Sequence, residues 1–125
     1  MATMRSIVAS LKVRITFTTG ERPDSKSWGA GAMHYRVTVH HARKRMTVWY
    51  SHGSAICADP TAEDVLGCLA SDASAADQDF PEWCAEYGYT DPGEAYKTWQ
   101  ACRKTRDDLA RVFGRNLSRV LSAEW

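Results

Sequence analysis

The stretch Cys57–Tyr96 reads CADPTAEDVLGCLASDASAADQDFPEWCAEYGYTDPGEAY and separates two parts of the chain that differ from it in charge. It contains ten carboxylates and neither Lys nor Arg. The residues before it carry nine basic and two acidic side chains, and the residues after it carry seven basic and three acidic ones. The formal net charge of +1 therefore conceals segment charges of +7, −10 and +4. Such asymmetry bears on partners and association rather than on fold.

Helix start signals occur twice inside this stretch. Thr61 is an expected N-cap, and the acidic residues after it suit the positive end of a helix dipole. Asp79 is a second expected N-cap, with Glu82 three residues on as its capping-box partner. We expect this second helix to be short, from about Phe80, and to stop at Gly88.

A third helix is predicted across the end of the stretch. Asp91 precedes Pro92, which suits the first helical position, and Gly114 marks the expected end after Phe113. Its expected buried side chains are Tyr96, Trp99, Cys102, Leu109, Val112 and Phe113. Residues 117–121 predict a last short helical turn.

Alternation of apolar and polar residues predicts strands in the first half of the chain. It covers Leu11–Phe17, returns at Tyr35–His40 and resumes at Arg45–Tyr50. The connector HARK predicts an antiparallel hairpin with a basic tip, and the Gly-, Pro- and Ser-containing segment 18–34 predicts a long loop. We therefore expect an α+β fold: a three-stranded antiparallel sheet in the N-terminal half, covered by three to four helices in the C-terminal half.

Size and composition fit one globular domain over residues 1–125, with 44% hydrophobic and 25% charged residues. No apolar run approaches the roughly 18 residues that a membrane span needs, so no contact with a membrane is expected. Lys12 and Arg14 interrupt the apolar N-terminus, so we interpret it as part of a strand and not as a signal peptide. A cytoplasmic location and reduced cysteines follow as expectations.

Motifs for metal binding or catalysis are missing from the sequence. The four cysteines form no C-x-x-C pair, and we interpret them as small buried hydrophobic residues. There is no G-x-S-x-G, H-E-x-x-H or glycine-rich phosphate loop. Asp79, Glu82 and Glu86 share a helix face and could act as acid–base groups, but caps and solvated faces are commoner. We expect no enzyme activity, no metal and no cofactor.

Two charged surfaces are candidate binding sites. The first is the acidic helical face, whose expected contacts are Asp72, Asp77, Asp79, Glu82 and Glu86. Regularly spaced carboxylates without a cation among them resemble a duplex phosphate array and would be attracted to a nucleic-acid groove of another protein. In the alternative interpretation, several of these carboxylates are helix caps and the basic strands neutralise the remainder.

The second candidate is the basic hairpin tip HHARKR, flanked by Trp49 and Tyr50. Arg43, Lys44 and Arg45 would bind phosphates there, with aromatic stacking beside them. A protected edge strand would have the same composition, because cationic side chains keep exposed edges from pairing.

The segments Asp64–Ser74 and Asp79–Tyr89 resemble small proteins encoded by bacteriophages and prophages, most of them without assigned function. The resemblance covers Val48–Cys102 and its motif is structural: caps, core positions and a glycine stop. Small phage proteins with acidic helical faces are often inhibitors of host defence, and anti-CRISPR proteins are the best-known class. The resemblance implies an inhibitor in the host bacterial cytoplasm that occludes a defence complex, such as a CRISPR effector, stoichiometrically. A small nucleic-acid-binding accessory protein using the hairpin tip is the alternative.

Overall fold

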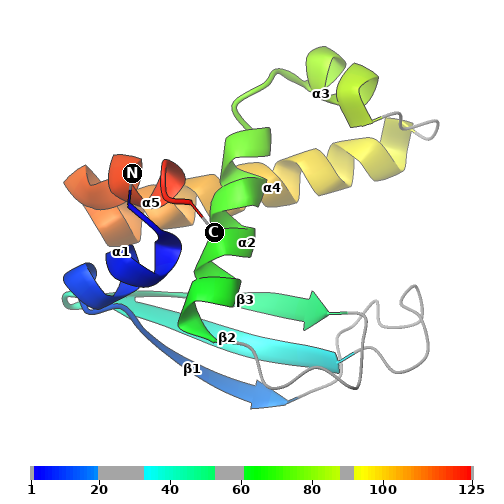
Figure 1. Ribbon diagram of the computed structural model, residues 1–125. Helices are drawn as coiled ribbons and strands as arrows, with labels where there is room; N and C mark the ends of the chain where they lie inside the picture. Colours follow the sequence, from blue (N-terminus) through cyan, green and yellow to red (C-terminus); the bar gives the residue numbers. More distant parts are fainter. Residues whose placement is uncertain (1, 20–32, 53–60, 88–91, 125) are drawn as a thin grey trace.

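The structure is a computed structural model, and it describes residues 2–19, 33–52, 61–87 and 92–124. In chain order its elements are α1 (Met4–Leu11), β1 (Arg14–Thr19), β2 (Met33–His41), β3 (Lys44–His52), α2 (Ala62–Ala75), α3 (Phe80–Tyr87), α4 (Pro92–Phe113), the 3₁₀ turn η2 (Gly114–Asn116) and α5 (Leu117–Leu121). The helices lie on one side of the sheet (Figure 1). The predicted α+β fold is confirmed.

The sheet is antiparallel with strand order β1-β2-β3. A two-residue turn joins β2 to β3, because His41 pairs with Lys44. Ala42 in this turn has φ 56°, a left-handed conformation that tight hairpin turns require at their first central position. The predicted hairpin is therefore confirmed.

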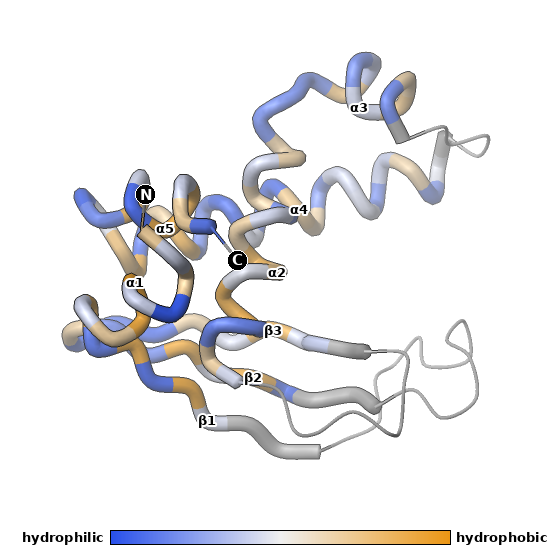
Figure 2. The backbone as a smooth tube through the Cα atoms, in the orientation of Figure 1, coloured by the Kyte–Doolittle hydropathy of each residue, from blue (hydrophilic) through white to orange (hydrophobic). Residues whose placement is uncertain are grey.

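One face of the sheet carries the hydrophobic core. Val37, Val39 and Met46 are buried on it, and Ile15 and Val48 pack against the same core. The hydrophobic part of α2 lies next to this face (Figure 2). Helix α2 also packs against α4, and α4 against β3. The buried helix residues of this core are Met4, Ile7, Val65, Leu66, Leu69, Ala70, Ala73, Leu109, Val112, Phe113 and Val120.

The N-terminus differs from the prediction. Residues 4–11 form helix α1, and β1 begins at Arg14 instead of Leu11. Thr3 caps α1, because its hydroxyl accepts a hydrogen bond from the Ser6 N–H at 3.1 Å. The apolar residues of 4–11 also follow the helical period, so that Leu11 fits both patterns. Lys12, at φ 54°, ends the helix.

Local signals placed the later helices correctly. The Thr61 side chain accepts from the Asp64 N–H, and the Asp64 carboxylate accepts from the Thr61 N–H, which completes a capping box. Asp79 accepts from the Glu82 N–H at 3.0 Å at the start of α3. Gly114 ends α4 with φ +51°. Gly88 and Asp91, two other predicted boundary residues, lie outside the described residues.

Two expectations need correction. The predicted loop 18–34 is wrong at both ends, because residues 18–19 belong to β1 and residues 33–34 to β2, while residues 20–32 lie outside the described part of the chain. Tyr96 is 44% exposed and not buried, because it lies near the start of α4, where its described ring contacts are Phe80 of α3 and Trp99 of α4. Trp99 and Cys102 are half-buried, whereas the last three predicted core residues of α4 are buried. No helix in the described ranges is long and apolar enough to cross a membrane.

Candidate nucleic-acid interface

The sheet has a second face, opposite the helices, that is built from the polar half of each strand's alternation (Figure 1). The strand register places Arg14, His40 and Arg45 side by side in one row across the three strands. The open sheet face, as we call this surface, consists of Arg14, Thr16, Arg36, Thr38, His40, Arg45, Thr47 and Trp49. Its arginines are exposed, and His40 and Trp49 are partly exposed.

Hydroxyl groups form the middle row of the open sheet face. Thr16, Thr38 and Thr47 are direct neighbours across the strands. The Thr38 and Thr47 hydroxyls form a hydrogen bond at 3.1 Å, and the Thr16 hydroxyl lies 3.2 Å from His40 Nε2. Beyond this row Arg36 pairs with Trp49. The face therefore offers cations, hydroxyls and one indole, which are the groups that contact phosphates and bases.

The pKa of His40 reflects the charges of the Arg14–His40–Arg45 row. Desolvation lowers its pKa, and the guanidinium groups of Arg14 and Arg45 on either side lower it further. Like charges directly opposite each other in a sheet are unfavourable, so this row favours a neutral ring while no anion is bound.

No carboxylate occurs in the described residues 2–19 and 33–52, which hold α1 and all three strands. Each ion pair found among the described residues connects two residues of α4 or connects α4 with Asp77. None of them includes a cation of the sheet. The positive charge of the open sheet face is therefore uncompensated within the described part of the molecule, and such a surface attracts polyanions.

The three cations of the predicted hairpin tip do not form one site. Arg43 lies in the turn, and Arg45 belongs to the open sheet face. Lys44 has the phase of Met46 and so belongs to the side of the helices. The backbone carbonyl of Arg45 accepts a hydrogen bond from Arg111 at 3.0 Å, which ties the tip to α4.

His41, next to the tip, has a structural environment. Its ring stacks on Phe113 with 4.8 Å between the ring centroids, and its Nδ1 lies 3.0 Å from the Leu11 carbonyl oxygen. Of the two histidines, only His40 belongs to the open sheet face.

The acidic residues lie at the other end of the molecule. We call residues 76–87, which comprise the hydrophilic connection after α2 and helix α3, the acidic arm (Figure 2). Asp77 forms an ion pair with Arg106 of α4 at 2.9 Å, and Glu86 accepts a hydrogen bond from Gln78. Asp79 is the cap of α3, and Glu82 is exposed one turn on. Local contacts thus occupy three of the four predicted arm carboxylates.

Asp72, the fifth predicted acidic contact, lies on α2, outside the arm. Desolvation raises its pKa, and its charge raises the pKa of the Cys68 and Cys102 thiols after the larger effect of their own burial. The pKa of Cys102 reaches about 11, so this thiol is protonated at neutral pH. Cys68, Cys84 and Cys102 are free and half-buried. No cluster of three or more metal-ligating side chains occurs among the described residues.

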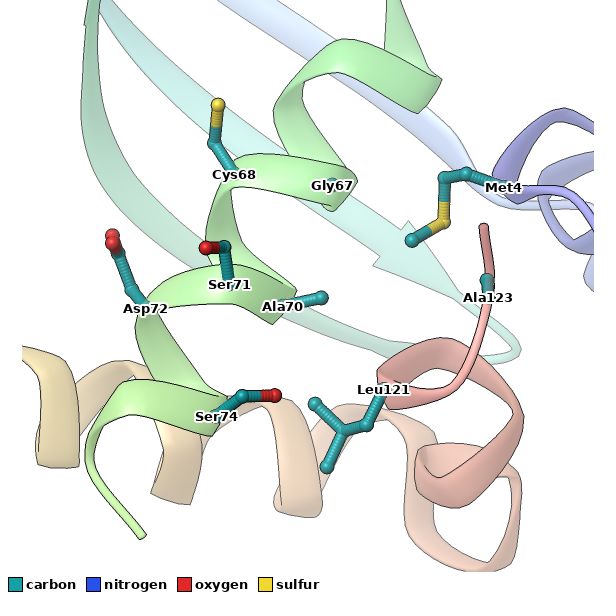
Figure 3. A pocket seen from close by; sticks show the side chains of 9 residues that line it. All are labelled: Met4, Gly67, Cys68, Ala70, Ser71, Asp72, Ser74, Leu121 and Ala123. Atoms are coloured by element: carbon teal, nitrogen blue, oxygen red, sulfur yellow. The ribbon is translucent and has the colours of Figure 1, made fainter. Parts of the chain in front are cut away.

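A pocket of about 460 Å³ lies beside α2 (Figure 3). Ala70 and Ser74 point toward Leu121, whereas Asp72 points to the other side of the helix. Small and apolar side chains dominate the side of the pocket between α2 and α5, and the one carboxylate is turned away from it. This arrangement supplies no converging polar groups that would hold a ligand.

Arg14 and Arg36 are functional candidates that were not predicted from the sequence, and His40 was included there only within the hairpin tip HHARKR. Each belongs to the polar half of a predicted strand, so the signal was present in the alternation itself. What the alternation lacked was the register that joins β1 to β2.

Comparison of the chain with protein-family models, curated proteins and solved structures found no match.

Proposed function

We propose that this protein binds nucleic acid on its open sheet face. The observation that carries the proposal is the cationic row Arg14–His40–Arg45, with hydroxyls and Trp49 on the same face and no carboxylate in the described strands. The role is binding and not catalysis.

The chemistry of the face suits a phosphate backbone. Exposed guanidinium groups neutralise phosphates and release counterions, which supplies most sequence-independent affinity. Threonine hydroxyls donate to phosphates and base edges, and an indole stacks on bases. A rigid sheet holds these groups at fixed spacing, so that little entropy is lost on binding.

The test is a fluorescence anisotropy titration of the full chain with a labelled mixed-sequence oligonucleotide, as single strand and as duplex, over a range of salt. We expect the double variant Arg14→Gln with Arg45→Gln to bind the preferred oligonucleotide at least about tenfold more weakly. The slope of log K against log salt concentration should also become less negative by about one to two. The matched control is Lys97→Gln with Arg115→Gln, which removes two exposed cations from α4 and the turn that follows it. Absence of binding by the unmodified chain, or equal losses in both double variants, would refute the proposal.

A second candidate function belongs to the acidic arm, as a protein-binding surface that competes with nucleic acid. Asp79, Glu82 and Glu86 are exposed there, close to the exposed ring of Tyr96, which contacts Phe80 edge-on at 5.2 Å. This is the surface that an inhibitor of a defence complex would use. The ion pair of Asp77 with Arg106 and the role of Asp79 as a helix cap reduce its uncompensated charge, so we rank it below the open sheet face. This function would be supported if the wild-type chain retained a bacterial defence complex in a pull-down and the double variant Glu82→Lys with Glu86→Lys did not.

A further inference from the structure

We propose that the preferred ligand of the open sheet face is single-stranded nucleic acid, with a phosphate at the Arg14–His40–Arg45 row and a base stacked on Trp49. This inference rests on the proposed function and adds the substrate class and two subsites.

Shape is the first argument. The helices lie on the other side of the sheet, so no described element flanks the open face with walls (Figure 1). A rigid duplex resting on such a broad face touches it along a narrow line of phosphates. The row of Arg14, His40 and Arg45 extends across three strands, roughly 10 Å between the outer strand axes. A flexible single strand can lie flat and reach all of it.

Trp49 is the second argument. Its side chain is partly exposed and pairs across the strands with Arg36, two rows away from His40. Two rows are four residues along a strand, about 13 Å. An indole gains little beside duplex phosphates, whereas it stacks on the exposed face of any unpaired base. Arg36 next to it adds a cation that can contact the neighbouring phosphate or stack.

The hydroxyl row between these subsites is the third argument. Thr16, Thr38 and Thr47 present groups that donate and accept hydrogen bonds. Unpaired bases expose their Watson–Crick edges to such groups, and a duplex does not.

His40 supplies an independent marker of the phosphate subsite. The groups that face its ring are Arg14 and the Thr16 hydroxyl from β1 and Arg45 from β3, and its nearest cation on β2 is Arg36. Without ligand the two flanking guanidinium groups oppose its protonation. A phosphate in the row reverses this electrostatic balance, so binding takes up a proton. Affinity therefore rises as the pH falls through the range in which His40 titrates.

The experiment uses the full chain and a labelled oligonucleotide of about twelve mixed nucleotides, offered as single strand and as duplex, with heparin as a polyanion without bases. We expect the single strand to bind at least about tenfold more tightly than the duplex. Trp49→Leu should lower single-strand affinity about tenfold and change heparin affinity by less than about twofold. Trp49→Phe retains an aromatic ring and should retain most of the affinity, which separates stacking from misfolding.

The pH arm of the experiment compares His40→Gln with His41→Gln between about pH 8 and pH 5.5. Wild type and His41→Gln should gain at least about threefold more single-strand affinity on acidification than His40→Gln does.

The outcomes separate the two proposals. Equal or tighter duplex binding, Trp49→Leu without effect on single-strand affinity, or an unchanged pH response in His40→Gln would overturn this inference while nucleic-acid binding stands. Binding of heparin alone would favour an acidic protein partner and overturn both proposals, as would no binding of any probe.

Discussion

The open sheet face and the acidic arm carry opposite charges, and they differ in how that charge is held. On the sheet, Arg14, Arg36 and Arg45 are exposed, and no carboxylate lies in the described strands. On the arm, Asp77 is paired with a cation of α4, and Asp79 is engaged as a helix cap. Charge count alone would rank the acidic stretch first, with ten carboxylates. Geometry reverses the ranking, because an ion pair and a helix cap engage two carboxylates of the arm, whereas no ion pair among the described residues reaches a cation of the sheet.

The two regions also differ in packing. The sheet belongs to the main core, whose members contact one another across β1–β3, α1, α2, α4 and α5. The arm has a separate small cluster, in which Trp83 is 3% exposed and Phe80 lies 5.5 Å from Trp99. The Trp99 Nε1–H donates to the Gln78 carbonyl at 3.1 Å and fixes the start of the arm. We therefore expect the arm to open without disturbing the sheet, since α3 packs against α4.

The largest expected effect comes from Trp83→Ala, which breaks the cluster of the arm. Truncation of a buried tryptophan costs about 3–5 kcal/mol, a cost that local opening of the arm can relieve. We expect hydrogen exchange to show lost protection in the arm and at the start of α4, with the strands unchanged and nucleic-acid affinity retained.

The matched control for Trp83→Ala is Leu66→Ala, because Leu66 is fully buried in the main core. This change should lower the free energy of unfolding of the whole domain by about 2–5 kcal/mol, measured by urea denaturation. Loss of strand protection in Trp83→Ala, as in Leu66→Ala, would show that the two regions are one cooperative unit.

A smaller effect is expected from the ion pair between Asp77 and Arg106. Both side chains are more than a third exposed, with relative accessibilities of 54% and 41%, so solvent weakens their attraction. A double-mutant cycle with Asp77→Asn and Arg106→Gln should give a coupling energy of about 0.2–1 kcal/mol, measured by denaturation at low salt and vanishing at high salt. A coupling energy of zero at low salt would contradict the compensation that distinguishes the arm from the sheet.

Sequence patterns predicted those parts of the fold that local signals determine. Thr61, Asp79 and Gly114 act within one helical turn, and each was placed correctly. Helix α1 was missed, because Leu11 satisfies both the helical and the strand period and was assigned to the strand pattern of residues 11–17.

The candidate sites depend on contacts that no local pattern contains. Asp77 and Arg106 are far apart in the sequence, so their pairing could not be inferred from either helix alone. The cationic row joins Arg14 to His40, which are distant in the sequence, and only the register reveals it. Each strand's polar half was predictable, and the surface that the three halves build was not.

The pH dependence of stability tests whether folding disfavours the negative charge of Asp72 on α2. Desolvation raises its pKa in the folded state above the ordinary value of 3.8, so folding favours the protonated form. This contribution to stability is fully present below pH 3.8 and is lost as the pH rises through the raised pKa. Asp72→Asn should therefore raise the free energy of unfolding at pH 7 by no more than about 0.5 kcal/mol. In acid, where the wild-type carboxyl is protonated, this difference should disappear. The free energy of unfolding of Asp72→Asn relative to wild type should be higher at pH 7 than at pH 3.8. The opposite order would contradict the expected effect of the raised pKa.

The smallest expected effect is that of Glu82→Lys with Glu86→Lys on nucleic-acid binding. These residues lie on α3, away from the open sheet face, so only a long-range field connects them to the ligand (Figure 1). At physiological salt that field is screened beyond about 8 Å, and affinity should rise by less than about twofold. Exposed positions move stability by only about 0.5 kcal/mol, and Asp79 is left in place because loss of a cap costs about 1 kcal/mol. The same variant removes the surface that the second candidate function needs, so its two readouts rank the two regions against each other. If the reversed arm lost a protein partner while Arg14→Gln with Arg45→Gln kept it, the acidic arm and not the sheet would be the functional surface.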